Sequence, residues 1–94
     1  MLFEWNEQKN ERNLKIHGID FKTAARVFAD SNRIEKYDER HSDEEDRYIT
    51  IGEINGTAYI VMVVYTEREE VIRIISARKA TSRERSAYYG ENEY

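Results

Sequence analysis

The stretch INGTAYIVMVVY, residues 54 to 65, carries the clearest structural signals in the chain. Its Asn55-Gly56 pair is the strongest short signal for a β-hairpin, because both central residues of the tight turn need positive φ. Residues 58–65 follow as an almost unbroken apolar run rich in β-branched side chains, which is typical of a central strand covered on both faces. Residues 47–54, before the turn, form the expected partner strand. The stretch therefore predicts an antiparallel sheet with residues 58–65 at its centre.

Two helices are predicted before this hairpin. Asn6 can cap a helix that runs to about His17, and Gly18 can take the left-handed position that ends it. Asp20 can cap a second helix. That helix carries one apolar stripe with the i, i+3, i+4, i+7 spacing, formed by Phe21, Ala24, Ala25 and Phe28. A short strand is expected at residues 2–5 and a weak one at residues 33–37, followed by an acidic turn at residues 41–47.

The region after the hairpin predicts one more strand and one more helix. A turn at residues 66–70 leads into a strand at residues 71–77, and residues 79–82 form the next connection. Thr81 and Glu84 make a T-x-x-E capping box that opens a terminal helix through Tyr89. Residues 90–94 are expected to fray. The order of strand, two helices, three or four antiparallel strands and one helix predicts an α+β fold in a single domain, residues 1–94.

The composition excludes several classes of protein. The 94 residues contain no cysteine, which rules out disulfides, thiolate zinc sites and a cysteine nucleophile. No apolar run approaches the ~20 residues of a membrane span, and the first residues lack the features of a signal peptide, so we expect a cytoplasmic protein without membrane contact. The net charge of -4 does not itself indicate nucleic acid. An argument for RNA must therefore rest on local charge.

Positive charge is concentrated near the C-terminus, in contrast to residues 35–46, which hold seven acids and two bases. Residues 71–89 contain a single acid, Glu84, beside five basic residues: Arg73, Arg78, Lys79, Arg83 and Arg85. Arg73 and Arg78 have opposite parity in an extended strand and face opposite sides unless a bulge intervenes. The helix N-terminus that follows suits a phosphate. Two interpretations stay open here: an anion site, or side chains that pair with the acidic turn or lie in water.

Five further residues each have a functional and a structural interpretation. Glu84 could act as a general base or orient an arginine, or it could be only the acid of the capping box. Tyr88 could stack on a base or donate a proton, or it could pack. His17 could be a general acid or base, or a cation at a helix end. Arg47 could reach the basic stretch or pair with the acidic turn. His41 and the acids beside it resemble a metal cluster in composition only, so no metal or cofactor is expected.

Four segments of the chain resemble the BrnT family of toxins from type II toxin–antitoxin modules. They are FEWNEQKNERNLKIHGIDF (residues 3–21), RYITIG (47–52), VVYTERE (63–69) and IRIISARKATSRERSAYY (72–89). The resemblance implies a small RNA-cleaving toxin with a RelE-like fold, in which helices pack on an antiparallel sheet. It also implies an antitoxin partner, BrnA, which is a ribbon-helix-helix DNA binder that masks the toxin and represses their operon. DNA is then contacted only through the antitoxin.

The resemblance also transfers site residues by motif. His17 of KIHG, Arg47 of RYITIG, Arg78 of SAR, and Glu84 and Tyr88 of ERSAYY are the expected catalytic residues. The expected RNA contacts are Arg73, Lys79, Arg83 and Arg85. Asn6 stands where the family usually has aspartate, so no catalytic acid is expected there. Preorganised arginines would stabilise the charge of a cleaving phosphate without a metal. Two alternatives remain: a non-catalytic module that binds nucleic acid or protein through the basic stretch, and a plain structural or oligomerisation module.

Overall fold

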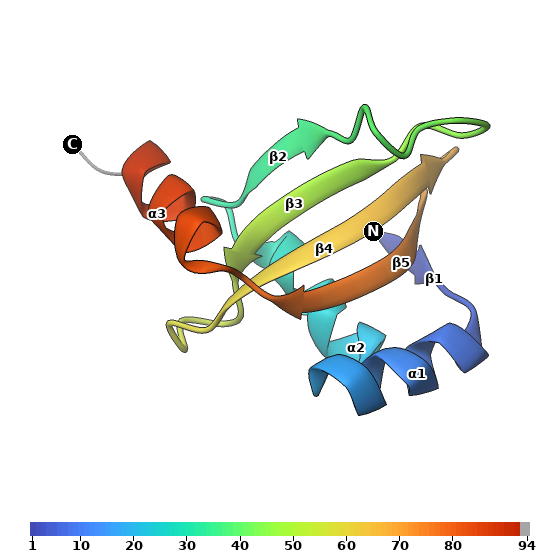
Figure 1. Cartoon of the computed structure of the whole chain (residues 1–94), viewed down its shortest axis with the longest axis horizontal. Helices are drawn as coiled ribbons and strands as arrows, with labels where there is room; N and C mark the ends of the chain where they lie inside the picture. The colour runs from blue at the N-terminus through green and yellow to red at the C-terminus, as the bar shows by residue number, and fades with distance from the viewer. Residues whose placement is uncertain (93–94) are drawn as a thin grey trace.

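One five-stranded sheet, in the order β1-β5-β4-β3-β2, organises the protein (Figure 1). The structure is a computed structural model that describes residues 1–92. Its strands are β1 (Leu2–Glu4), β2 (Ile34–Tyr37), β3 (Tyr48–Glu53), β4 (Ile60–Arg68) and β5 (Val71–Lys79). β3 and β4 pair antiparallel, and β4 lies at the centre of the sheet. Thr57 N–H donates to the Ile54 carbonyl across Asn55 and Gly56, which both have positive φ. The predicted hairpin and central strand are confirmed.

The N-terminal strand makes the sheet mixed, so the prediction of an antiparallel sheet was wrong for this strand. β1 pairs in parallel with β5, with Leu2 opposite Val71 and Glu4 opposite Arg73. A parallel pair needs a long connection, which the rest of the chain supplies. Phe3 of β1 also packs on the core, with its ring centroid 5.3 Å from that of Phe28. The strand is therefore held by the core as well as by β5.

The hairpin of β4 and β5 is longer than the sequence predicted. Pairing extends from Arg68 opposite Val71 to Val61 opposite Lys79, with one shift of register between Val64 and Tyr65. The expected turn at residues 66–70 therefore contracts to Glu69 and Glu70, and Glu69 adopts a positive φ of 54°. The expected connection at residues 79–82 likewise contracts to Ala80 and Thr81. Polar side chains obscured these strand ends in the sequence, although backbone pairing can continue past them.

The helices begin at the predicted caps. α1 (Glu7–His17) is capped by Asn6, whose side chain accepts the Lys9 N–H, and it ends at Gly18 with φ 73°. The side chain of Asp20 caps α2 (Phe21–Ala24), which continues as the 3₁₀ turn η1 (Ala25–Ala29). α3 (Ser82–Glu91) runs past Tyr89, so the prediction of fraying was wrong for residues 90 and 91. Residues 93 and 94 of the predicted frayed tail lie outside the described residues.

The two faces of the sheet are covered differently. α2 and η1 cover one face, where Phe21, Val27 and Phe28 pack with Val63 and Tyr65 in the larger core, while α1 lies along the edge of β5 (Figure 1). Gly52 is needed there, because a Cβ at this position would lie 2.8 Å from Val27 Cγ1. On the opposite face, only one end is covered, by α3 (Figure 1).

The smaller core lies under α3, where Tyr88 packs with Ile51, Ile60 and Met62. We call this second side of the sheet the open face. In residues 1–92, no helix combines the length and the apolar composition needed to cross a membrane.

Candidate active site

A β-bulge in β5 determines which way its basic side chains point. Val64 pairs with Ser76 whereas Tyr65 pairs with Ile74, so Ile75 is the extra residue. An extra residue reverses the alternation of side chains along a strand. Arg73 and Arg78 therefore lie on the same face of the sheet, despite their opposite parity in the sequence. That face is the open one, because Arg78 pairs with Met62 of the smaller core.

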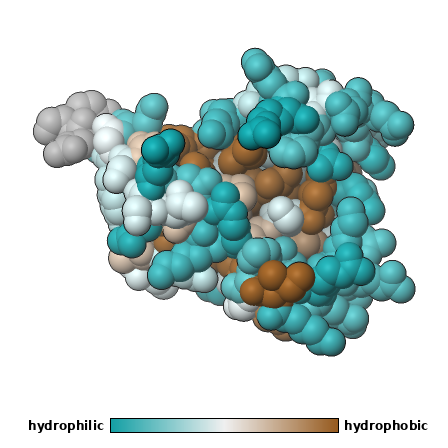
Figure 2. Space-filling model, in the orientation of Figure 1, coloured by the Kyte–Doolittle hydropathy of each residue, from teal (hydrophilic) through white to brown (hydrophobic). Residues whose placement is uncertain are grey.

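The open face contains a groove of about 580 Å³ between β5 and the loop that joins β2 to β3. The groove is lined by apolar side chains on its floor, namely Ile49, Met62, Val64 and Ile75. Basic side chains also line it, namely Lys36, Arg40, Arg47 and Arg78. Figure 2 shows this face with an apolar centre surrounded by hydrophilic side chains. An apolar floor with a few convergent polar groups is the usual composition of a ligand site.

Arg47 is held over the groove by the loop of residues 38–47. The Asp38 N–H donates to the Arg47 carbonyl at 2.9 Å, which closes the loop at its base. The Ser42 hydroxyl donates to the Asp38 carbonyl at 2.5 Å and accepts the Arg47 N–H at 2.9 Å. Arg47 makes no ion pair with any side chain in residues 1–92. Of its two predicted positions, the structure therefore supports the one near the basic stretch.

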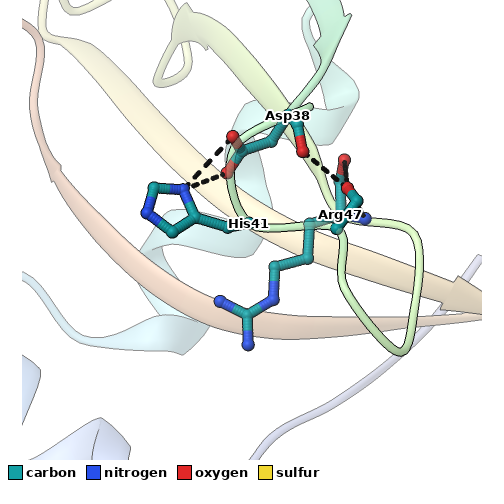
Figure 3. Close-up of polar contacts among 4 residues, drawn as sticks. Asp38, His41 and Arg47 are labelled. Carbon is teal, nitrogen blue, oxygen red and sulfur yellow. Dashed lines mark hydrogen bonds and ion pairs between the residues drawn. The ribbon is translucent and has the colours of Figure 1, made fainter.

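His41 lies in the same loop and also lines the groove. Its Nδ1 lies 3.0 and 3.2 Å from the two carboxylate oxygens of Asp38 (Figure 3). The sequence predicted an acidic turn at residues 41–47, with a resemblance to a metal cluster in composition only. Among residues 1–92, no group of three or more His, Asp and Glu side chains is placed to hold a metal ion. No sequence pattern predicted that the groove would be lined by Lys36, Asp38, Arg40 and His41, and the D-x-x-H spacing was the one available signal.

Glu84 makes both of the contacts that the sequence left as alternatives. Its N–H donates to Thr81 Oγ1 at 3.1 Å and its Oε1 accepts the Thr81 N–H at 2.8 Å, which confirms the capping box. The same carboxylate accepts two bonds from Arg78, from Nη1 at 2.7 Å and from Nη2 at 3.0 Å. Burial opposes the charged form, but the bonds from Arg78 and Thr81 outweigh it and lower the pKa of Glu84. The helix cap therefore also orients the groove arginine.

Tyr88 does not line the groove. Its ring is buried in the smaller core, and its hydroxyl donates to Asp30 Oδ2 at 2.6 Å. The other bond to that oxygen comes from the Glu53 N–H at 2.8 Å. Burial and the bond to Asp30 raise the pKa of the Tyr88 phenol far above its ordinary value. The contacts of Tyr88 thus match its packing interpretation and attach α3 to the sheet.

His17 lies in a smaller neighbouring hollow with Lys9, Arg12 and Asn13. That hollow shares Ile75 and Ser76 with the groove, so the two are separated by the edge of β5. His17 is exposed and makes no side-chain hydrogen bond with the part of the chain that the structure describes. The structure therefore places His17 beside the groove and His41 within its lining.

The predicted RNA contacts divide among several surfaces. Arg73 lies on the open face, where it pairs with Glu4 at 2.9 Å. Arg83 lines a further hollow beside α3, which shares Lys36 and Ile49 with the groove. Lys79 faces the other side of the sheet, because it pairs with Val61 of the larger core. Arg85 lies on α3 beside Tyr89, away from the groove lining.

Comparisons with known proteins agree with this architecture. The family model described as the ribonuclease toxin BrnT of type II toxin–antitoxin systems matches residues 5–84, a range that includes Arg47, Arg78 and Glu84. The crystal structure of the Brucella abortus ribonuclease toxin BrnT matches with a TM-score of 0.62 and 27% sequence identity, covering 87% of this chain and 100% of that chain. No curated protein matches. The chain therefore belongs to the BrnT family of ribonuclease toxins of type II toxin–antitoxin systems.

Proposed function

We propose that this protein cleaves RNA in the groove of the open face by acid–base chemistry that needs no metal ion. The observation that carries the proposal is the convergence of Arg47 and Arg78 on one apolar-floored groove, from segments far apart in the sequence. A nucleotide combines an anionic phosphate with a flat, largely apolar base. The basic lining suits the first part and the floor suits the second.

The chemistry follows from the charge that develops at the phosphate. A 2′-hydroxyl that loses its proton attacks the adjacent phosphorus. The five-coordinate phosphorus that forms carries extra negative charge on its oxygens. Preorganised guanidinium groups stabilise such charge, and each such contact is typically worth 10²–10³-fold in rate, or about 3 kcal/mol. In this proposal, Arg47 and Arg78 supply that stabilisation. Arg78 is already oriented by Glu84 and keeps N–H groups beyond the two that Glu84 occupies.

The other site residues expected from the family motifs are proposed to act at a greater distance from the cleaved phosphate. Glu84 is proposed as a positioning residue for Arg78, and Tyr88 as one that fixes α3 through Asp30. His17 is proposed to act from the adjoining hollow, on the part of the RNA that crosses the edge of β5. Arg73 and Arg83 flank the groove and are proposed to contact further phosphates. Lys79 and Arg85 lie elsewhere and are proposed as weaker, longer-range contacts.

A neighbouring antitoxin is proposed as the second partner. The family's place in type II modules implies an antitoxin, and we propose that it is a BrnA-like ribbon-helix-helix protein. It would silence the toxin by covering the groove that Arg47 and Arg78 line, and it would bring the toxin to DNA only indirectly. We further propose that the sheet and helices follow the RelE-like plan and that the protein acts in the cytoplasm, where its RNA substrate is.

The test is cleavage of single-stranded RNA by the purified protein in excess chelator. Fragments that end in a 2′,3′-cyclic phosphate are expected, because the 2′-hydroxyl is the nucleophile, and single-stranded DNA should stay intact. Arg78→Ala should lower the rate about 10²-fold. The matched control is Lys22→Ala, which removes one exposed charge from the helix-covered side. Circular dichroism melts of all variants separate lost chemistry from lost folding.

Each other outcome of this test has a definite meaning. Cleavage that stops in chelator and returns with magnesium would overturn the metal-independent mechanism but keep the nuclease. Tight RNA binding without cleavage, alone or with ribosomes, would support the binding-module alternative. An Arg78→Ala protein that cleaves at the wild-type rate would show that the groove is not the site of cleavage. Addition of the antitoxin should end cleavage.

A further inference from the structure

The loop of residues 38–47 presents a histidine in a defined orientation. Asp38 is buried, and its side chain is only 9% exposed, whereas the His41 side chain is 64% exposed. An ionised carboxylate can only accept hydrogen bonds, so the Nδ1 that faces Asp38 must carry a hydrogen. A neutral His41 then has its acceptor lone pair on Nε2 (Figure 3). This is the arrangement in which a carboxylate fixes the tautomer and angle of a catalytic imidazole.

The imidazole is not what holds the loop together. The loop is closed by main-chain and hydroxyl bonds among Asp38, Ser42 and Arg47, none of which involves the His41 ring. The ring is mostly exposed and lies in the lining of the groove, together with Arg47 and Arg78. His17, by contrast, has no carboxylate within hydrogen-bond distance among the described residues and lines a separate hollow. The main chain of Asp38 therefore has a structural role in closing the loop, whereas the ring of His41 has none in that closure.

We propose that His41 is a proton-transfer residue of the groove and that Asp38 is its positioning residue. This inference rests on the proposed function, because it assigns a residue to the same cleavage. The Nε2 lone pair takes the proton of the 2′-hydroxyl while the 2′ oxygen forms its bond to phosphorus. The bond from phosphorus to the 5′ oxygen then breaks, and that oxygen leaves with the electron pair and takes a proton from water. Arg47 and Arg78 stabilise the phosphate oxygens throughout.

The decisive variant is His41→Asn, because an asparagine amide can still donate to Asp38 but offers no basic nitrogen. We expect kcat/KM for RNA cleavage to fall about 10²- to 10⁴-fold, the range that a general acid or base typically contributes. His41→Ala should fall similarly and regain activity when imidazole is added to the buffer. The Arg78→Ala protein should gain nothing from imidazole. Glu44→Gln, an exposed change in the same loop, is the matched control and should cleave at the wild-type rate.

Asp38→Asn tests the positioning role. It should lower kcat with little change in KM, because the tautomer of His41 is no longer fixed while the arginines still bind the phosphate. A rise in KM with kcat unchanged would contradict that role.

The outcomes separate this inference from the proposed function. A wild-type protein that cleaves no RNA overturns both. A wild-type protein that cleaves, with His41→Asn equally active, overturns the role of His41 alone and leaves the groove arginines in place. Loss of activity in His41→Ala without any rescue by imidazole, together with a lowered melting temperature, would show that the histidine serves the loop and not the proton.

Discussion

The Glu84 carboxylate connects the helix cap to the groove, because it accepts bonds from Thr81 and from Arg78 at once. A charged acceptor that receives several bonds is bound more strongly than a neutral one. The depressed pKa of Glu84 follows from this, against the opposing effect of its burial. The stability of α3 and the orientation of Arg78 are therefore linked through one side chain.

Glu84→Gln should lower the free energy of unfolding by about 1–2 kcal/mol at pH 7. The folded pKa lies below the unfolded value of about 4.3, so the stabilisation is present above that value and is lost as the pH falls through the folded pKa. Urea unfolding at pH 7, 5 and 3 measures the difference between the two proteins. The difference in free energy of unfolding between the two proteins should be equal at pH 7 and 5 and should shrink at pH 3. A difference that persists unchanged at pH 3 would mean that the charge of Glu84 is not its source.

At the scale of elements, the edge of β5 is completed by α1. β1 pairs only with residues 71–73, which leaves the rest of this edge without a strand. The Asn13 amide takes that place, since its Nδ2 donates to the Ala77 carbonyl at 2.7 Å and its Oδ1 accepts the Ala77 N–H at 3.2 Å. The same Nδ2 donates to the Ile19 carbonyl at 2.9 Å. An unpaired edge invites association with other chains, so this side chain also protects the sheet.

Asn13→Leu should destabilise the protein by about 3 kcal/mol, because it leaves a buried N–H and carbonyls without partners, each worth about 1–3 kcal/mol. Chemical unfolding followed by circular dichroism measures this loss. Gln8→Leu, an exposed change on the same helix, is the control and should stay within about 0.5 kcal/mol of the wild type. Equal stability of the two variants would show that the edge bonds contribute little.

For the whole molecule, charge is segregated. The chain carries a net charge of -4, yet the groove is lined by Lys36, Arg40, Arg47 and Arg78 with only two acids, Asp38 and Glu39. Some acidic side chains outside the groove form ion pairs with basic ones, as Glu45 does with Arg68. The groove therefore attracts an anion although the protein as a whole repels one.

RNA binding should weaken steeply with salt. Each phosphate contact to a single strand contributes about -0.7 to the slope of log K against log salt concentration, so about three contacts give a slope near -2. Affinity should then fall roughly 16-fold between 50 and 200 mM salt. Fluorescence polarisation with a 2′-deoxy oligonucleotide, which lacks the nucleophile, measures binding without cleavage. Arg47→Ala should reduce the slope by about 0.7, and a slope that does not change would exclude Arg47 from phosphate contact.

Local chemistry allowed the sequence alone to predict much of the fold. Asn6, Gly18 and Asp20 end or begin helices, and Thr81 with Glu84 forms the capping box, because each of these signals acts within four residues. The turn at Asn55-Gly56 and the central strand were predictable for the same reason. The family motifs also identified Arg47 and Arg78, which do meet in one groove.

Only the tertiary structure decided how distant residues combine. β1 joins β5 in parallel at the sheet edge, where Phe3 packs on Phe28, a contact that no local pattern encodes. The bulge at Ile75 brings Arg73 and Arg78 to one face, since the register of β5 is set by its pairing with β4. Tyr88 shared a helix face with Glu84 in the sequence, yet the tertiary fold buries it against Asp30. His41 became a groove residue because long-range pairing of β2 with β3 folds its loop beside β5, whereas its sequence neighbours suggested only an acidic turn.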